Sequence, residues 1–253
     1  MPDLPNDALT QLQRTHAAGV KLLASHEFEA EAKEVAIQVE RHRWFWRPSN
    51  PRILLVAESH VFTSDEDREV RIDRTKISRF GRANASPPPE SFVRLVYCLG
   101  YGETQLLKGA PEHFNNPGTP RYWDIFGRVT GRGPQPRPEN GAELDNRLAW
   151  KIETLREMCR RGIWLLDASA HAIYLGYGQR LSRAIKDELH RQWWDGYGCH
   201  VVASCSETKI WVIGKTVFNC LNALPDWRCR GWIYQPNYDM KTNWQGMLKD
   251  CER

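Results

Sequence analysis

The chain has 253 residues, of which 41% are hydrophobic and 26% are charged, a composition typical of a folded globular protein. This argues against wholesale disorder, and no apolar run approaches the ~20 residues that a membrane-spanning helix needs. The formal net charge of +4 permits an anionic partner without demonstrating one, because binding depends on how the basic residues cluster.

The seven cysteines do not have the spacing of a zinc or iron–sulfur site, because the sequence contains no C-x-x-C pair. No apolar signal segment stands at the N-terminus. We therefore expect reduced thiols in a cytoplasmic, monomeric protein that uses no metal or other cofactor and does not contact membranes.

Residues 1–46 are predicted to form a helical region that packs on the core of the protein. Apolar residues recur at helical spacing between positions 7 and 43, and we expect two helices with a break near Gly19 or Ser25. The aromatic residues at 44–46 are predicted to close this region as a packed corner, in preference to stacking on bases.

A short buried strand is predicted at 53–56, where four apolar residues follow the breaker Pro51. The run stops at three polar residues, Glu58, Ser59 and His60. In open α/β sheets the ligand crevice lies beyond the carboxyl ends of the strands. This triplet is therefore the first candidate for a functional site.

The next part of the chain mixes capping and turn signals. Residues 63–67 have a capping pattern that predicts a helix or ordered loop, and residues 76–89 are predicted to be a flap over the site or a plain surface loop. Apolar residues at helical spacing predict a helix over 91–99.

Residues 105–141 are predicted to be the least regular part of the chain, with strong turn signals at 115–118 and 131–134. Basic residues, among them Arg121, Arg128 and Arg132, are interleaved there with aromatic residues. In a loop rich in glycine and proline, this mixture suits binding to a nucleic-acid backbone and unstacked bases. The alternative is a solvated loop that its aromatic residues anchor.

The second half of the chain alternates between helical and strand patterns. Helices are predicted at 146–161, at 179–194 and after Gly214, and strands at 163–166, 210–213 and near 232–234. Strands separated by helices predict an α/β fold with a mostly parallel central sheet and helices on both faces. No linker divides the chain, so we expect residues 47–253 to form one domain.

Gly214-Lys215-Thr216 suggests a phosphate-binding loop, but the glycine that such a loop needs five positions earlier is Lys209. More informative are the polar residues that follow three predicted strands: Glu58, Ser59 and His60; Asp167 and Ser169; Gln235, Asn237 and Asp239. In a parallel sheet all three strand ends lie at one edge, so these side chains are predicted to converge on one pocket.

The order of these segments resembles that of the uracil-DNA glycosylase superfamily. In that family the first strand ends in G-Q-D-P-Y-H or G-E-A-P-G, a later strand reads L-L-L-N-A, a third precedes a glycine and a helix, and the last ends in H-P-S-P. Here the corresponding segments read A-E-S-H-V at 57–61, I-W-L-L-D-A at 163–168, I-W-V-I-G at 210–214 and Y-Q-P-N-Y at 234–238. The resemblance spans roughly residues 50 to 248, and its strength lies in order and spacing.

The resemblance implies a uracil-DNA-glycosylase-like fold and a DNA glycosylase that flips a nucleotide out of DNA and hydrolyses its glycosidic bond. It places Glu58 as the carboxylate that stabilises the oxocarbenium-like transition state and orients water, with His60 assisting. Ser59 stands where one branch of the family has its catalytic Asp. Gln235 replaces the His of the last motif, and a neutral Gln donates a weaker hydrogen bond than a cation does.

Asp167 stands where the family has the Asn that reads uracil. An ionised Asp only accepts hydrogen bonds and repels O4 of uracil, whereas it suits the N4 amine of cytosine. A buried Asp that keeps a proton can also donate to N3. Members of the superfamily that act in phage defence excise hypermodified cytosines. We therefore expect a modified cytosine, such as glucosylated hydroxymethylcytosine, rather than uracil.

The remaining roles are placed by the same resemblance. Phe62 or Phe80 is expected to stack on the base, Gln235 and Asn237 to contact the base or a flanking phosphate, and Tyr238 or Met240 to wedge into the duplex. Three alternatives stay open. They are a hydrolase of free nucleosides or nucleotides, a catalytically inactive nucleic-acid-binding module of the same fold, and a purely structural protein.

Overall fold

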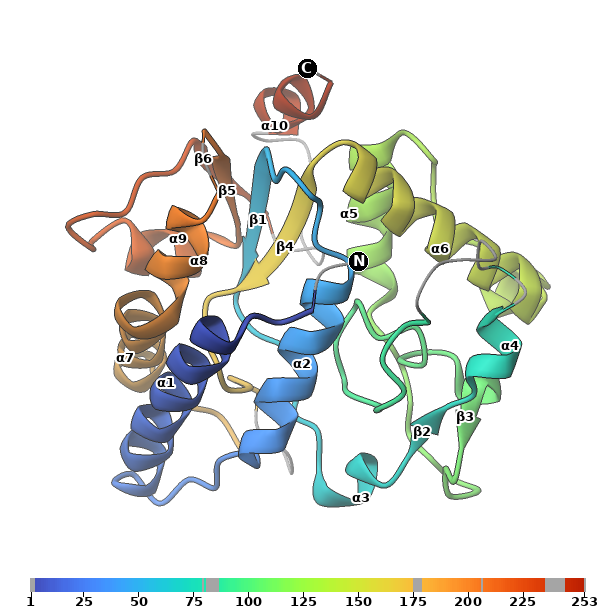
Figure 1. Cartoon of the computed structure of the whole chain (residues 1–253), viewed down its shortest axis with the longest axis horizontal. Coiled ribbons are helices and arrows are strands. Elements are labelled where there is room, and N and C mark those ends of the chain that lie inside the picture. The colour runs from blue at the N-terminus through green and yellow to red at the C-terminus, as the bar shows by residue number, and fades with distance from the viewer. Residues whose placement is uncertain are drawn as a thin grey trace.

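Four parallel strands form the centre of the protein, in the order β4-β1-β5-β6 (Figure 1). They are β1 (Ile53–Ala57), β4 (Ile163–Asp167), β5 (Lys209–Ile213) and β6 (Gly231–Ile233). The computed structural model describes residues 3–78, 80, 87–174, 179–205, 207–234 and 244–252. All four predicted strands are confirmed, and so is the parallel α/β sheet.

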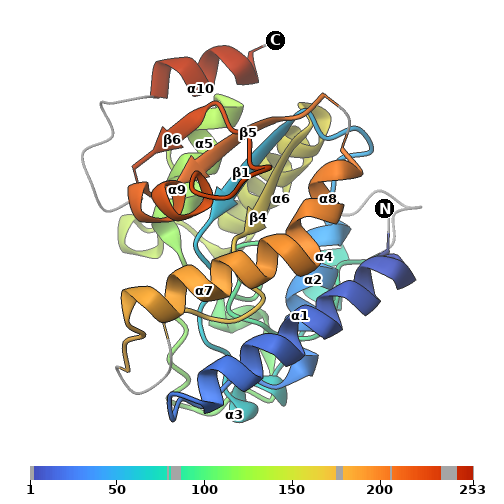
Figure 2. The ribbon, with the colours of Figure 1, turned by 90° about the vertical axis from the view of Figure 1, so that its left-hand side faces the viewer.

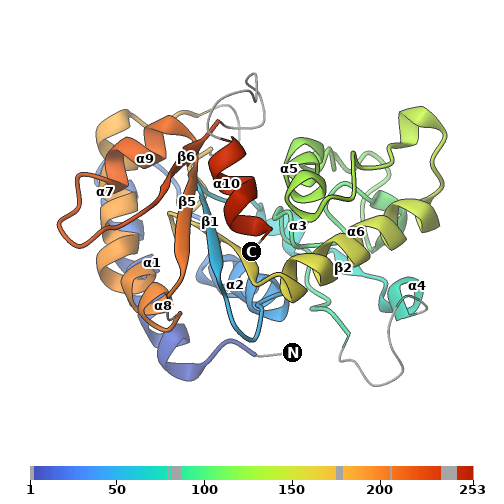
Figure 3. The same cartoon turned by 90° about the horizontal axis from the view of Figure 1, so that it is seen from above.

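Helices cover both faces of this sheet (Figure 3). One face carries α1 (Asn6–Ala24), α7 (Arg183–Trp193), α8 (Cys199–Ala203) and α9 (Lys215–Leu221), and the other carries α5 (Pro120–Thr130), α6 (Leu144–Arg160) and α10 (Trp244–Cys251). Figure 2 shows α1 and α7 running side by side. Burial on both faces explains why the strand sequences are almost continuously apolar rather than alternating.

Shorter elements lie outside the main sheet. They are α3 (Asp65–Arg68), α4 (Arg74–Ser78), a two-stranded antiparallel ribbon of β2 (Arg71–Ile72) and β3 (Leu107–Lys108), the 3-10 turns Thr104–Leu106 and Pro138–Asn140, and a π-helical turn at Trp194–Gly198. The predicted capping pattern before α3 is confirmed, because Ser64 and Asp67 form a reciprocal capping box.

The N-terminal region forms two helices, α1 and α2 (Lys33–Phe45), and its break lies at Ser25 and not at Gly19. Gly19 lies inside α1, where a Cβ atom would come within 2.3 Å of the His171 ring. Glycine is needed there for this close approach. Side chains from both helices, including Leu12 and Val39, belong to the same hydrophobic core as the sheet.

The helix predicted over 91–99 is wrong, because this segment consists of turns and bends. Its backbone pairs with other parts of the chain: Arg94 N–H donates to the Thr63 hydroxyl at 3.0 Å, and Val61 N–H donates to the Arg94 carbonyl at 3.0 Å. Nearly every apolar side chain in the segment is buried, so the apparent helical period reflected a segment surrounded by core rather than one amphipathic face.

The prediction of an irregular loop over 105–141 is wrong for the middle of this segment, which forms α5. The helix begins with Pro120 and ends before Gly131, a glycine in the left-handed conformation (φ 73°). Trp123 and Phe126 are buried on this helix and are not displayed for contact with bases.

In the part of the chain that the structure describes, no helix is long and apolar enough to cross a membrane.

Candidate functional site

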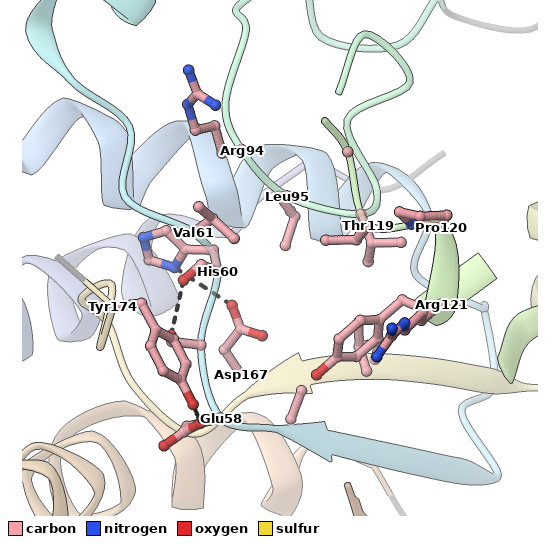
Figure 4. Close-up of a pocket in the computed structure, with 16 residues that line it drawn as sticks. Glu58, His60, Val61, Arg94, Leu95, Thr119, Pro120, Arg121, Asp167 and Tyr174 are labelled. Carbon is pink, nitrogen blue, oxygen red and sulfur yellow. Dashed lines mark hydrogen bonds and ion pairs between the residues drawn. The ribbon is translucent and has the colours of Figure 1, made fainter. Parts of the chain in front are cut away.

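A cavity of about 330 Å³ lies beyond the carboxyl ends of β1 and β4 (Figure 4). These two strands are neighbours in the sheet, and Ala57 pairs in register with Asp167. The polar residues that follow both strands therefore lie beside one another, as predicted. The cavity is lined by Ala57, Glu58, Ser59, His60, Val61, Arg94, Leu95, Val96, Gly118, Thr119, Pro120, Arg121, Tyr122, Leu165, Asp167 and Tyr174.

Asp167 is buried beside two cations that approach the same carboxylate oxygen. Arg43 Nη2 donates to Oδ2 at 2.7 Å, and His60 Nδ1 lies 3.5 Å from that atom. The other oxygen, Oδ1, accepts no hydrogen bond from the described residues. Burial alone would raise the pKa of the carboxyl group, but Arg43 and His60 bring it below its ordinary value. The two cations therefore favour the ionised form of Asp167 over the form that keeps a proton and donates to N3.

His60 is held between two carboxylates. Its Nε2 lies 2.8 Å from Glu31 Oε2, and its Nδ1 faces Asp167. Burial disfavours the charged ring, but Glu31 and Asp167 overcome this and raise the pKa of His60 to about 9. At neutral pH His60 is an imidazolium with no free lone pair, so it can assist chemistry through its charge but cannot take a proton from water.

Glu31, in the linker between α1 and α2, connects the loops that follow β1 and β4. Besides His60 it accepts the Thr63 N–H at 2.6 Å and the Ala172 N–H at 3.0 Å. Nothing in the local sequence distinguishes Glu31 from a surface residue. Arg43 was also missed, but here a signal existed: it continues the apolar stripe Val35–Val39 of α2 at a spacing of four, which places a charge on a buried face.

Glu58 lies on the cavity wall with its carboxylate beside Tyr174, as Figure 4 shows. The Tyr174 hydroxyl donates to Oε2 at 2.7 Å, and Lys186 of α7 places Nζ 3.5 Å from Oε1. Lys186 also lies over the Tyr174 ring, 4.7 Å from its centroid. The carboxylate is therefore held in one orientation while it remains part of the wall.

Ser59 lines the cavity too, but its hydroxyl is used to hold the backbone. It accepts the Ile173 N–H at 3.1 Å and donates to the His60 carbonyl at 2.8 Å. This geometry joins the loop after β1 to the loop after β4. The Ser59 hydroxyl is therefore a structural link at the site rather than a group poised for attack.

The expectation that Phe62 or Phe80 lines the base pocket is wrong. Phe62 packs on a separate apolar cluster that contains Leu23 and Ile173, and Phe80 packs on the main core. The aromatic rings on the cavity wall are those of Tyr122 and Tyr174. Burial raises the pKa of the Tyr122 phenol, and the charges of Asp167 and Glu58 raise it further, so its hydroxyl keeps its proton.

The structure brings Arg121 to the cavity, at the first turn of α5, but not Arg128 or Arg132. Arg128 lies over the Trp244 ring at 4.9 Å, and Arg132 lines a separate hollow beside Trp46. Arg94, which was not predicted, also lines the cavity, where Asp67 holds its guanidinium with two hydrogen bonds of 2.7 and 2.9 Å.

The predicted residues Gln235, Asn237, Tyr238 and Met240 lie outside the described residues. Within the described residues, no three His, Cys, Asp or Glu side chains are grouped so that they could hold a metal ion. The ionisable side chains that line the cavity belong to Glu58, His60, Arg94, Arg121, Tyr122, Asp167 and Tyr174.

The buried histidines predict how the stability of the fold depends on pH. His60, with a pKa of about 9 against an ordinary 6.5, stabilises the fold below pH 6.5, and this stability is lost as the pH rises to 9. Burial lowers the pKa of His42 and His171 to about 4, so stability is also lost as the pH falls from 6.5 to 4. We therefore expect the free energy of unfolding to be greatest near pH 6.5.

Urea unfolding between pH 4.5 and 9 measures this profile. The alkaline decline should be on the order of 3 kcal/mol, because each unit of pKa shift corresponds to about 1.4 kcal/mol. The His60→Gln protein should lose that decline and keep the acid one. A free energy of unfolding that stays constant from pH 6.5 to 9 in the unmodified protein would contradict the ion pair between His60 and Glu31.

Comparison with protein-family models, with curated proteins and with solved structures gives no match to this chain.

Proposed function

We propose that this protein is a DNA glycosylase that removes a modified cytosine rather than uracil. The observation that carries the proposal is the buried carboxylate of Asp167 on the cavity wall: Arg43 binds its Oδ2, and Oδ1 is available to accept a hydrogen bond. Such a group favours a base edge that carries an amine and repels one that carries a carbonyl oxygen. The order of the sequence motifs supports a glycosylase, and the carboxylate of Asp167 supports an amine-bearing base as its substrate.

The dimensions of the cavity support a bound nucleobase. Its volume of about 330 Å³ lies within the range of small-molecule pockets, and aromatic and apolar side chains share its wall with a few polar groups. A base that enters it from DNA must first leave the stack, at a cost of a few kcal/mol. Arg121, which lines the cavity in the first turn of α5, supports this by adding a positive charge that suits the phosphate flanking such a nucleotide.

Hydrolysis at this site begins when the bond between the sugar C1′ and the base nitrogen breaks, with both electrons leaving on the base. The sugar becomes an oxocarbenium-like cation, which the fixed carboxylate of Glu58 stabilises. Water then adds to C1′, and the proton it loses balances the charge of the departing base. Arg43 and His60 offset part of the charge of Asp167, which weakens the repulsion between this carboxylate and the negative charge that develops on the base.

A strand-scission assay tests the proposal. The protein is incubated with single-stranded and duplex DNA carrying uracil, cytosine, hydroxymethylcytosine or glucosylated hydroxymethylcytosine, and alkali then cleaves at abasic sites. We expect scission at a modified cytosine and much less at uracil. The proposal fails if no substrate is cleaved. Binding of DNA without abasic sites would favour an inactive binding module, and release of base from free nucleosides alone would favour a nucleoside hydrolase.

A further inference from the structure

Arg43 contacts Asp167, a residue of the cavity wall, from α2, an element that precedes the sheet in the sequence. Its guanidinium and the carboxylate of Asp167 are both almost completely buried, with 1% and 2% of their side chains exposed. Nη2 donates to Asp167 Oδ2 at 2.7 Å, while Nη1 contacts Glu40. The Trp164 indole N–H donates to the Arg43 carbonyl at 3.0 Å, which fixes the end of α2 on β4. These contacts hold the Arg43 guanidinium against Asp167.

We propose that Arg43 is a positioning residue that determines which base the cavity accepts. By binding Oδ2 it leaves Oδ1 of Asp167 as a bare acceptor that takes an amine and rejects a carbonyl. The inference rests on the proposed function, because it assumes that Asp167 contacts a base. It goes further in assigning base selection to a residue of the N-terminal helices that does not itself line the cavity.

Arg43 can control base selection because a buried charge that no opposite charge compensates is costly. A carboxylate so little exposed takes up a proton unless a cation compensates it, and the protonated group both donates and accepts. A protonated Asp167 could then donate to O4 of uracil, so the selection against carbonyl oxygens would disappear. His60 is the second cation, but it is farther from Oδ2, at 3.5 Å, and it is shared with Glu31. Arg43 thus contributes the larger part of the compensation.

Several other ionisable groups lie around Asp167 and interact with its charge. They are Glu40 from α2, His60 after β1, Tyr97 before β3, and Tyr122 from α5. Burial raises the pKa of Tyr97 and Tyr122, so both stay neutral, and Glu40 is bound by Arg43 and by the Tyr197 hydroxyl at 2.8 Å. Arg43 and His60 are therefore the groups that oppose protonation of Asp167.

The test measures base preference without requiring catalysis. Single-stranded DNA probes carry one central 2′-fluoro-2′-deoxycytidine, 2′-fluoro-2′-deoxyuridine or 2′-fluoro-2′-deoxyadenosine, because fluorine disfavours the oxocarbenium ion and keeps the base attached. Dissociation constants are measured for the unmodified protein, for Arg43→Gln and for Arg43→Lys. The matched control is Arg147→Gln, which removes another buried arginine, paired with Glu103 and absent from the cavity wall.

We expect the unmodified protein and the Arg43→Lys and Arg147→Gln variants to prefer the cytosine probe over the uracil probe by about tenfold or more. Arg43→Gln should reduce that preference to near unity, and the preference should increase again as the pH rises, because a higher pH favours the ionised carboxylate of Asp167. The adenine probe has a similar amine edge, and weaker binding of this probe shows that cavity shape restricts the site to pyrimidines.

An unchanged cytosine preference in folded Arg43→Gln overturns the inference, as does equal binding of both pyrimidine probes by the unmodified protein. If Arg43→Gln does not fold, the carboxyl ¹³C resonance of Asp167, assigned with Asp167→Asn, gives the answer in the unmodified protein: a protonated group at pH 7 overturns the inference. Loss of preference in Arg43→Gln, in a protein that never cleaves DNA, supports this inference while the glycosylase proposal fails.

Discussion

Replacing Glu58 by glutamine is expected to slow excision of the base by about 10²–10⁴-fold, because the oxocarbenium-like transition state loses its stabilising carboxylate. Glutamine keeps the volume of the side chain and an oxygen that can accept the Tyr174 hydroxyl, now 2.7 Å from Oε2. The substitution therefore removes charge rather than shape. Single-turnover cleavage of a modified-cytosine substrate, followed by alkaline strand scission, measures the effect on the chemical step.

The matched control for this substitution is Glu103→Gln. Glu103 is also buried and is held by Lys151 at 2.7 Å and by Arg147 at 2.8 Å, but it does not line the cavity. Its loss should lower the melting temperature and leave the single-turnover rate of the folded protein unchanged. A Glu58→Gln protein that cleaves at the rate of the unmodified protein would remove Glu58 from the mechanism, and attention would pass to the carboxylate of Asp167.

The sheet could be predicted from the sequence because its strands are buried on both faces. Residues 53–56, 163–166 and 210–213 are short apolar runs bounded by breakers or polar residues, and each lies within a strand. Once the strands are parallel, their carboxyl ends meet at one edge. This rule alone placed Asp167 beside His60, two residues separated by more than a hundred positions in the sequence.

The segments predicted wrongly are those in which tertiary contacts outweigh local pattern. Residues 91–99 have helical spacing, but their backbone groups find partners in the neighbouring segments 61–63 and 70–71. The opposite error occurred at α5, where a loop was predicted because of many turn signals and the structure has a helix. Its signals were Pro120 at the first helical position and Gly131 just past the end, a pair that marks the two ends of a helix.

Some of the residues that line the candidate site could be predicted from the sequence, but the residues that hold them in place could not. Residues that end a strand carry a positional signal, and Glu58, His60 and Asp167 all have it. Arg43 and Glu31 come from α2 and from the linker before it, and only folding brings them against Asp167 and His60 of the cavity wall. The protonation state of Asp167 depends on both residues. Arg43 binds Asp167 directly, whereas Glu31 acts indirectly, because it binds His60, which faces Asp167. Composition and spacing cannot supply that information.

Replacing Asp167 by asparagine is expected to shift the preference of the cavity from an amine-bearing base towards uracil. Arg43 Nη2 and the cationic His60 both face the position of Oδ2, so they will bind the amide oxygen of the new side chain. The amide NH₂ must then occupy the position of Oδ1, where it can donate to O4 of uracil. A similar donor facing the N4 amine of cytosine makes no hydrogen bond and repels it.

The ratio of excision rates, uracil over modified cytosine, should therefore rise at least about 30-fold. Loss of the amine contact and gain of the carbonyl contact each contribute about 1–3 kcal/mol. The control is Asp250→Asn, since Asp250 is also a carboxylate bound to a cation, Lys209 at 2.6 Å, but does not line the cavity. An Asp167→Asn protein that is folded and keeps the original ratio would show that Asp167 does not contact the base, and that the selection lies in another wall of the cavity.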